Sequence, residues 1–101
     1  AQGKVIQAVF DDKSPEEARF LAVQIIHDAE RIVLFGAHSE TQSHLILAAA
    51  EGLGLDVRTL IPAVSAVVQV RGGGSPSLVE LVTTEKGKVG PALEAVKKFL
   101  E

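Results

Sequence analysis

The apolar positions of this chain change from strand-like to helical spacing several times. Residues 4–10, Lys-Val-Ile-Gln-Ala-Val-Phe, have the composition of a strand, and the polar turn 11–13 follows them. Residues 14–17, Ser-Pro-Glu-Glu, form a capping box with proline in the first helical position, which predicts that a helix starts at Ser14. Apolar residues then recur at helical spacing and predict a helix that ends near Glu30: Ala18, Leu21, Ala22, Ile25 and Ala29.

The middle of the chain predicts a hairpin and then a second helix. Apolar runs at 32–35 and 45–50 flank the polar segment 37–43, as in a hairpin of buried strands. Asp56 can cap a helix with the apolar stripe Val57, Leu60, Ile61, Val64, Val67 and Val68. Pro62 lies inside that stripe, and an interior proline costs about 3 kcal/mol. Either this helix kinks at Pro62, or its regular geometry begins only at Thr59.

The last third of the chain completes the predicted fold. Residues 78–84 have the β-branched composition of a strand, and we expect a final helix to begin at Pro91, after Gly90. Its expected buried face consists of Val89, Leu93, Val96 and Leu100. The element order β-α-β-β-α-β-α predicts an α/β (α+β) fold, in which three helices cover a single mixed sheet of about four to five strands.

Composition is typical of a single soluble domain. The 101 residues suit one core, 47% are hydrophobic and 23% are charged, and no segment approaches the ~18 apolar residues of a membrane span. The absence of cysteine excludes disulfides, thiolate zinc sites and cysteine nucleophiles. We therefore expect one cytoplasmic domain over residues 1–101. Because the chain lacks methionine and enters a strand pattern soon after Ala1, we expect it to be a fragment of a larger protein.

Residues 71–77, Arg-Gly-Gly-Gly-Ser-Pro-Ser, form the one segment with a distinctive chemistry. Three consecutive glycines suit a loop whose backbone amides approach a phosphate or a ribose, since no Cβ intervenes. A flexible connector would have the same composition. The segment lacks the closing Gly-Lys-Ser/Thr of a P-loop, and it does not follow a first strand as a dinucleotide-binding loop does. Nucleotide hydrolysis and a Rossmann function are therefore disfavoured.

The charge of the chain limits how it can bind nucleic acid. A net charge of -3 argues against binding by bulk electrostatics, so any RNA contact has to be local. The basic side chains considered for such a contact are Arg71, Lys86, Lys88, Lys97 and Lys98. The alternative is that they form an ordinary solvated surface. The residues that we predict to contact nucleic acid are Arg71, Gly72, Gly73, Gly74, Ser75, Ser77, Lys86 and Lys88.

No catalytic or metal-binding set is predicted. His38, Glu40 and His44 lie around one predicted turn but do not supply three ligands of defined geometry, and His27 suits the last turn of the first helix. The carboxylate pairs are adjacent in sequence and are explained by solvation and helix capping. No serine lies in a Gly-x-Ser-x-Gly elbow. We predict a non-catalytic domain that holds no metal or other cofactor of its own.

The element order and the glycine motif together resemble the DHH-associated domain, which closes alanyl-tRNA synthetases and the long form of the free-standing editing proteins called AlaX. The resemblance runs from residues 32–36, Ile-Val-Leu-Phe-Gly, through 54–56, Gly-Leu-Asp, and 71–78, Arg-Gly-Gly-Gly-Ser-Pro-Ser-Leu, to the helix at 91–96, Pro-Ala-Leu-Glu-Ala-Val. The Gly-Gly-Gly-x-Pro-x core is typical of the tRNA-linked branch. The branch attached to DHH phosphoesterases carries a Gly-Gly-His motif that is absent from this sequence.

The resemblance implies a domain that binds tRNA, specific for alanine, or single-stranded nucleic acid, and that helps a separate catalytic domain to act on mischarged alanine tRNA. A zinc-binding editing hydrolase or an ATP-using synthetase would then lie outside this chain, and the serine before Pro76 is closer to the editing proteins. Residues 79–83, Val-Glu-Leu-Val-Thr, depart from the Ala-Gln-Ala-Gly-Gly segment usual in the family, and Glu80 would repel a nearby phosphate. Two alternatives stay open: the substrate-binding lobe of a DHH phosphoesterase, and a structural domain that forms a homodimer.

Overall fold

The computed structural model describes residues 4–100, so residues 1–3 and 101 of the predicted domain lie outside the described part. Five strands form one sheet in the order β1-β2-β3-β5-β4, with β1 parallel to β2 and the other neighbours antiparallel. The elements in chain order are β1 (Lys4–Phe10), α1 (Pro15–Asp28), β2 (Arg31–His38), β3 (Ser43–Ala49), the 3-10 turns η1 (Glu51–Leu53) and η2 (Val57–Leu60), α2 (Ile61–Ser65), β4 (Arg71–Gly74), β5 (Leu78–Thr83), the 3-10 turn η3 (Lys86–Lys88) and α3 (Val89–Leu100). The predicted mixed sheet with three helices is confirmed.

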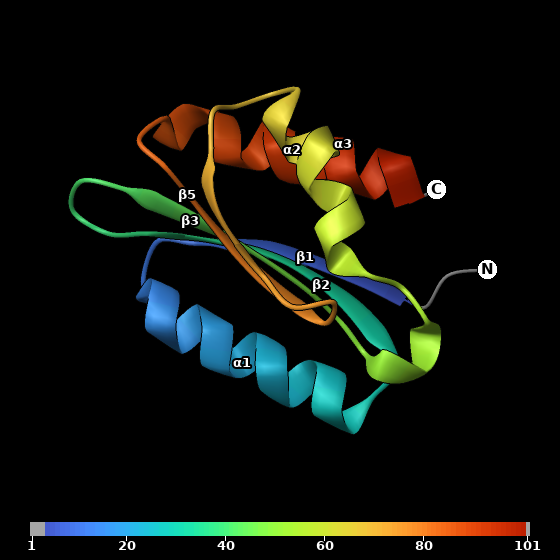
Figure 1. Ribbon diagram of the computed structural model, residues 1–101. Helices are drawn as coiled ribbons and strands as arrows, with labels where there is room; N and C mark the ends of the chain where they lie inside the picture. The colour runs from blue at the N-terminus through green and yellow to red at the C-terminus, as the bar shows by residue number, and fades with distance from the viewer. Residues whose placement is uncertain (1–3, 101) are drawn as a thin grey trace.

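The sheet separates two apolar layers, with α1 on one face and α2 and α3 on the other (Figure 1). Alternate residues of a strand point to opposite faces. Ile32 and Leu34 of β2 therefore pack in the layer of α2 and α3, whereas Val33 and Phe35 pack in the layer of α1. Because β2 and β3 are buried on both faces, each has a continuous apolar sequence.

The capping box of α1 forms as predicted. The backbone N–H of Glu17 donates to Oγ of Ser14 at 3.1 Å, and the N–H of Ser14 donates to the Glu17 carboxylate at 2.9 Å. The bond from the Ser14 backbone to the carboxylate, and after it hydrogen bonding by the Ser14 hydroxyl, holds the pKa of Glu17 below its usual value. The helix ends at Asp28 rather than near Glu30, because Ala29 is already extended and leads into β2.

The two remaining helices begin at other positions than expected. The segment after Asp56 is divided into η2 and the short α2, so Pro62 lies in the first turn of α2, where it breaks no helical hydrogen bond. The helix therefore does not kink at Pro62. It starts late, as the alternative prediction had it, although it begins at Ile61 and not at Thr59. Asp56 caps η2 by accepting the N–H of Arg58 at 3.0 Å.

α3 begins at Val89, two residues before Pro91, because η3 leads directly into it and proline fits the first turn. Its buried residues are Val89, Ala92, Leu93 and Val96. Among residues 4–100, no helix is both long and apolar enough to cross a membrane.

Candidate nucleic-acid interface

The glycine segment is a strand and not the loop that the sequence suggested. Residues 71–74 form β4, which pairs antiparallel with β5 and lies at one edge of the sheet. All four residues of β4 are exposed. The loop was expected because glycine has a low intrinsic strand propensity, but pairing with β5 through a tight connection at Pro76 and Ser77 outweighs that preference.

The hydrogen-bond pattern of β4 leaves backbone groups free along the sheet edge. Ser75 and Leu78 exchange both backbone bonds, at 2.9 and 3.4 Å, and such pairs alternate with non-hydrogen-bonded pairs along an antiparallel ladder. Gly73 is then in the next hydrogen-bonded pair, and Gly72 and Gly74 occupy the positions between. The N–H and C=O groups of Gly72 and Gly74 therefore point away from β5, toward the open edge.

Two of the three glycines are required by the closeness of β5. A Cβ on Gly72 would lie 2.3 Å from the backbone oxygen of Glu80, and one on Gly74 would lie 2.1 Å from that of Leu78. Gly72 also has a φ of 130°, which L residues with a side chain rarely adopt. Gly73 is different, since a Cβ added there would meet no atom within 4 Å. A side chain at Gly73 would thus extend into open space beside β4 and would not press on β5.

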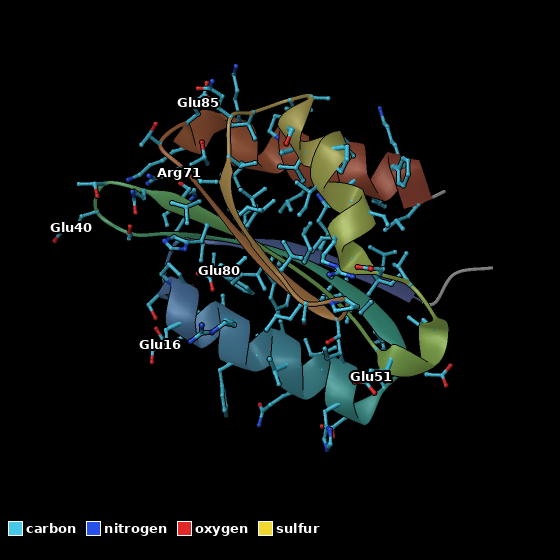
Figure 2. All side chains as sticks on the ribbon, in the orientation of Figure 1. Glu16, Glu40, Glu51, Arg71, Glu80 and Glu85 are labelled. Atoms are coloured by element: carbon cyan, nitrogen blue, oxygen red, sulfur yellow. The ribbon has the colours of Figure 1, made fainter. Side chains whose placement is uncertain are left out.

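The other predicted contact residues gather at the two ends of β4. Ser75 and Ser77 lie in the β4–β5 turn, where their hydroxyls are 3.5 Å apart. Arg71 is at the opposite end, and Figure 2 shows it at the same corner of the molecule as Glu85. Lys86 and Lys88 follow Glu85 in η3. The structure therefore does not bring all eight residues into one cluster: four lie on β4 at the sheet edge, the two serines lie in the turn after it, and the two lysines lie in η3.

The two lysines have partners of their own. Nζ of Lys88 lies 3.4 Å from the carboxylate of Glu85, and Nζ of Lys86 donates to the backbone oxygen of Glu40 at 3.3 Å. Both side chains are exposed, so these contacts can be exchanged for others at little cost.

Glu80 lies beside this edge with two basic neighbours that sequence reasoning missed. It faces the α1 side of β5, where its carboxylate is 2.8 Å from Nδ1 of His44 and 3.7 Å from the guanidinium of Arg19. Glu80 and His44 are 36 residues apart, and only the pairing of β3 with β5 makes them neighbours, so no local pattern indicates the contact. The expected repulsion between Glu80 and a phosphate is reduced by these two cationic or protonatable groups.

Two of the three histidines make contacts within the fold. Nδ1 of His38 is 2.6 Å from Oγ of Ser43, the residue opposite it in the β2–β3 hairpin, and His44 contacts Glu80. Over residues 4–100, His, Asp and Glu side chains form no group of three that could hold a metal ion.

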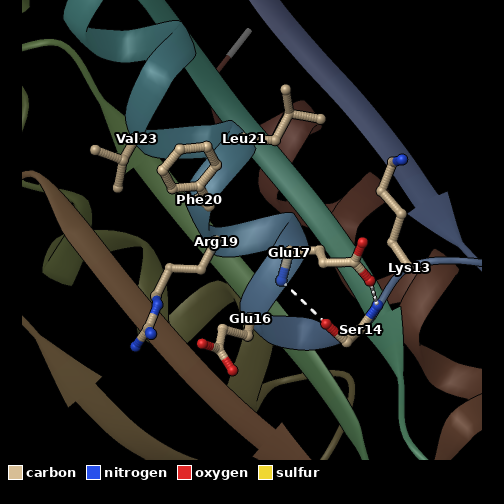
Figure 3. Close-up of a pocket in the computed structure, with 8 residues that line it drawn as sticks. All are labelled: Lys13, Ser14, Glu16, Glu17, Arg19, Phe20, Leu21 and Val23. Atoms are coloured by element: carbon tan, nitrogen blue, oxygen red, sulfur yellow. Dashed lines mark hydrogen bonds between the residues drawn. The ribbon is translucent and has the colours of Figure 1, made fainter.

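A cavity of about 640 Å³ lies along α1, away from the predicted contact residues (Figure 3). Its lining comes from α1 and the turn before it, including the Ser14–Glu17 cap and the exposed ring of Phe20. None of the eight predicted contact residues lines it.

The comparisons with known proteins identify the fold. No protein-family model and no curated protein matches the sequence. Among solved structures, the C-Ala domain of Aquifex aeolicus alanyl-tRNA synthetase superposes with a TM-score of 0.81 at 20% identity, over 93% of this chain and 87% of that domain. The fold is that of the C-Ala domain. The fold expected from the family resemblance is therefore confirmed.

The C-Ala fold is also found inside a larger protein. Two structures of RecJ from Thermus thermophilus, one with Mn²⁺ and one with Mg²⁺, match with TM-scores of 0.69 and 0.67 at 13% and 16% identity. They cover 97% and 98% of this chain, but the chain spans only 14% and 15% of RecJ. At these identities the likeness establishes the fold alone.

Proposed function

We propose that this chain is a tRNA-binding module of an alanyl-tRNA editing protein or an alanyl-tRNA synthetase, and that it positions alanine tRNA for a catalytic domain outside the chain. The observation that carries the proposal is the bare edge strand β4 on a C-Ala fold: four exposed residues, three of them glycine, with Arg71 at one end. On this account the chain itself is not an enzyme, works in the cytoplasm and holds no cofactor.

The edge suits a phosphate backbone for two physical reasons. The free N–H groups of Gly72 and Gly74 can donate to phosphate oxygens, and no side chain keeps the backbone of the RNA at a distance. Arg71 adds a guanidinium, which can bind a phosphate through two parallel hydrogen bonds. Ser75 and Ser77 extend the set of donors beyond the end of β4, while Lys86 and Lys88 extend it beyond Arg71.

The overall charge sets the expected strength of binding. A chain of net charge -3 is repelled by RNA at long range, so the local contacts have to outweigh that repulsion. Few phosphates are then neutralised, and the affinity should depend on salt less steeply than that of a basic RNA-binding domain.

Two alternatives have specific support. The RecJ match favours a substrate-binding lobe of a DHH phosphoesterase, for which single-stranded DNA should bind as well as tRNA. The open edges of the sheet, β1 and β4, favour a dimerisation domain, for which sedimentation should show a homodimer without RNA.

The proposal is tested by titrating labelled alanine tRNA against wild type, Arg71→Ala and Gly73→Val at several salt concentrations. Arg71→Ala should weaken binding and lower the slope of log affinity against log salt by about one unit, because one phosphate contact is lost. Gly73→Val should weaken binding with little change in slope, because it blocks close approach and removes no charge. Because Gly73 has no positive φ and a Cβ added there meets no other atom within 4 Å, the Gly73→Val variant should still fold.

Lys98→Ala is the charge-matched control. Lys98 is exposed in the last turn of α3. This end of α3 lies beside the C mark in Figure 1, at the opposite end of the molecule from Arg71, which Figure 2 labels, so the loss of Lys98 should leave the slope unchanged. If wild type and all three variants bind equally weakly, β4 does not bind RNA and the dimerisation domain replaces this proposal.

A further inference from the structure

A cavity of about 420 Å³ opens beside Arg71, between the start of β4 and the turn that joins β2 to β3. We propose that this cavity binds one unpaired nucleobase of the RNA and prefers a base with an amino group to uracil. The proposal rests on the proposed function and adds to it, because a phosphate contact alone carries no base preference. Besides Arg71, the lining residues are Gln42, Gln69, Val70, Val82, Thr84 and Glu85.

The lining suits a flat, uncharged group with polar edges. Val70 and Val82 supply apolar surface and are each half-buried, while the side-chain amides of Gln42 and Gln69 can both donate and accept hydrogen bonds. A second phosphate would be repelled here, since the carboxylate of Glu85 is part of the lining. A volume of about 420 Å³ is within the range of small-ligand sites.

Glu85 is held in place before any ligand arrives. Its Oε2 accepts the backbone N–H of Gln69 at 3.2 Å, its Oε1 lies 3.4 Å from Nζ of Lys88, and its own N–H donates to Oγ1 of Thr83 at 3.0 Å. Two carboxylate oxygens offer about four acceptor positions, so these contacts leave acceptor capacity on each oxygen. A carboxylate that is already oriented loses little entropy when it accepts a further hydrogen bond.

This fixed acceptor distinguishes bases by their amino groups. The N4 amino group of cytosine donates to a carboxylate, whereas uracil, of nearly the same size, has the acceptor O4 in that position. The two pyrimidines therefore differ mainly in the one contact that Glu85 reads. The neighbouring Arg71 can hold the phosphate of the same nucleotide, which connects the cavity to β4.

Bases reach such a cavity only when they are not stacked in a duplex, as in loops and single strands. The test is fluorescence anisotropy of the full chain with short oligo(C) and oligo(U) RNAs of equal length. Wild type should bind oligo(C) about tenfold more tightly than oligo(U), the effect of one good base contact. In Glu85→Gln the ratio should fall to near one, since an amide can turn to accept from cytosine or donate to uracil.

The ratio separates base reading from charge. Glu85→Gln also releases Lys88 and reduces the negative charge, which strengthens binding of both RNAs alike. Glu16→Gln makes the same charge change on the exposed side of α1 (Figure 3) and should leave the ratio of wild type intact. Gln42→Ala removes an amide from the cavity without breaking a side-chain hydrogen bond of the described residues, and it should lower the ratio as well.

Each outcome supports or overturns the proposal. A wild-type ratio near one, or a ratio that Glu85→Gln leaves unchanged, overturns the base cavity while tRNA binding along β4 still stands. Binding of tRNA without binding of either oligonucleotide overturns it in the same way. If neither tRNA nor the oligonucleotides bind, the proposed function fails too.

Discussion

Replacing Gly72 with alanine should disrupt the edge strand, whereas the same change at Gly73 should be tolerated. The new Cβ at position 72 would lie 2.3 Å from the backbone oxygen of Glu80 and 3.2 Å from Cα of Leu81, so β4 has to move away from β5. The φ of 130° adds strain for any residue with a side chain. At Gly73 the Cβ meets no atom within 4 Å.

The size of the effect follows from these two costs. A residue held in a sparsely populated backbone region costs about 1–3 kcal/mol, and a forced steric overlap costs about 1–3 kcal/mol more. Gly72→Ala should therefore destabilise the domain by about 2–6 kcal/mol. Gly73→Ala should change the free energy of unfolding by no more than about 0.5 kcal/mol, as is usual for an exposed site.

Urea denaturation measures the difference between the two variants. With a slope of about 1–3 kcal/mol per molar urea, Gly72→Ala should unfold at least about 0.5 M below Gly73→Ala. If β4 instead detaches locally, the backbone N–H of Glu80, whose partner is Gly73, should exchange with solvent faster. Equal midpoints together with equal exchange of the Glu80 amide would refute the pairing of β4 with β5.

Three further predictions concern the cap, the acid beside the edge and the absence of catalysis. Ser14→Ala should cost about 1 kcal/mol in chemical denaturation. Because the folded-state pKa of Glu17 is lowered, its ionised carboxylate should stabilise the fold above the unfolded-state pKa, and this stabilisation should be lost as pH falls through the folded-state pKa. NMR titration of the Glu17 carboxyl would show the lowered pKa. Glu80→Gln should strengthen tRNA binding, measured by the same titration as Arg71→Ala, because it removes a negative charge beside β4 and keeps a hydrogen-bond partner for His44. The purified chain should neither bind zinc stoichiometrically nor deacylate mischarged alanine tRNA, and turnover in a deacylation assay would contradict the proposed division of labour.

Short sequence patterns correctly predicted the elements that depend only on neighbouring residues. The capping box at Ser14 needs only four consecutive residues, and it forms as expected. Pro62 and Pro91 both lie in first turns, which is where proline costs least, although each helix starts before its proline. The continuous apolar runs likewise indicated a hairpin of buried strands, and the structure shows that β2 and β3 are buried on both faces.

Features that depend on strand register could not be predicted from local patterns. Whether three glycines form a loop or an edge strand is decided by β5, whose backbone approaches Gly72 and Gly74 so closely that only glycine fits. The contact between Glu80 and His44 and the cavity beside Arg71 also exist only because distant segments are paired. The conformation expected for the candidate site was therefore wrong, because a loop was expected and residues 71–74 form an edge strand.

The central claim is that RNA is bound along the free edge of β4. The most direct measurement is an NMR titration of the ¹⁵N-labelled chain with alanine tRNA, following the backbone amides. The amides of Gly72 and Gly74, which point away from β5, should shift or broaden most, together with that of Arg71, while those of β1 at the opposite edge stay unchanged. Perturbation of β1 or of the exposed side of α1, with Gly72 and Gly74 unaffected, would contradict the account.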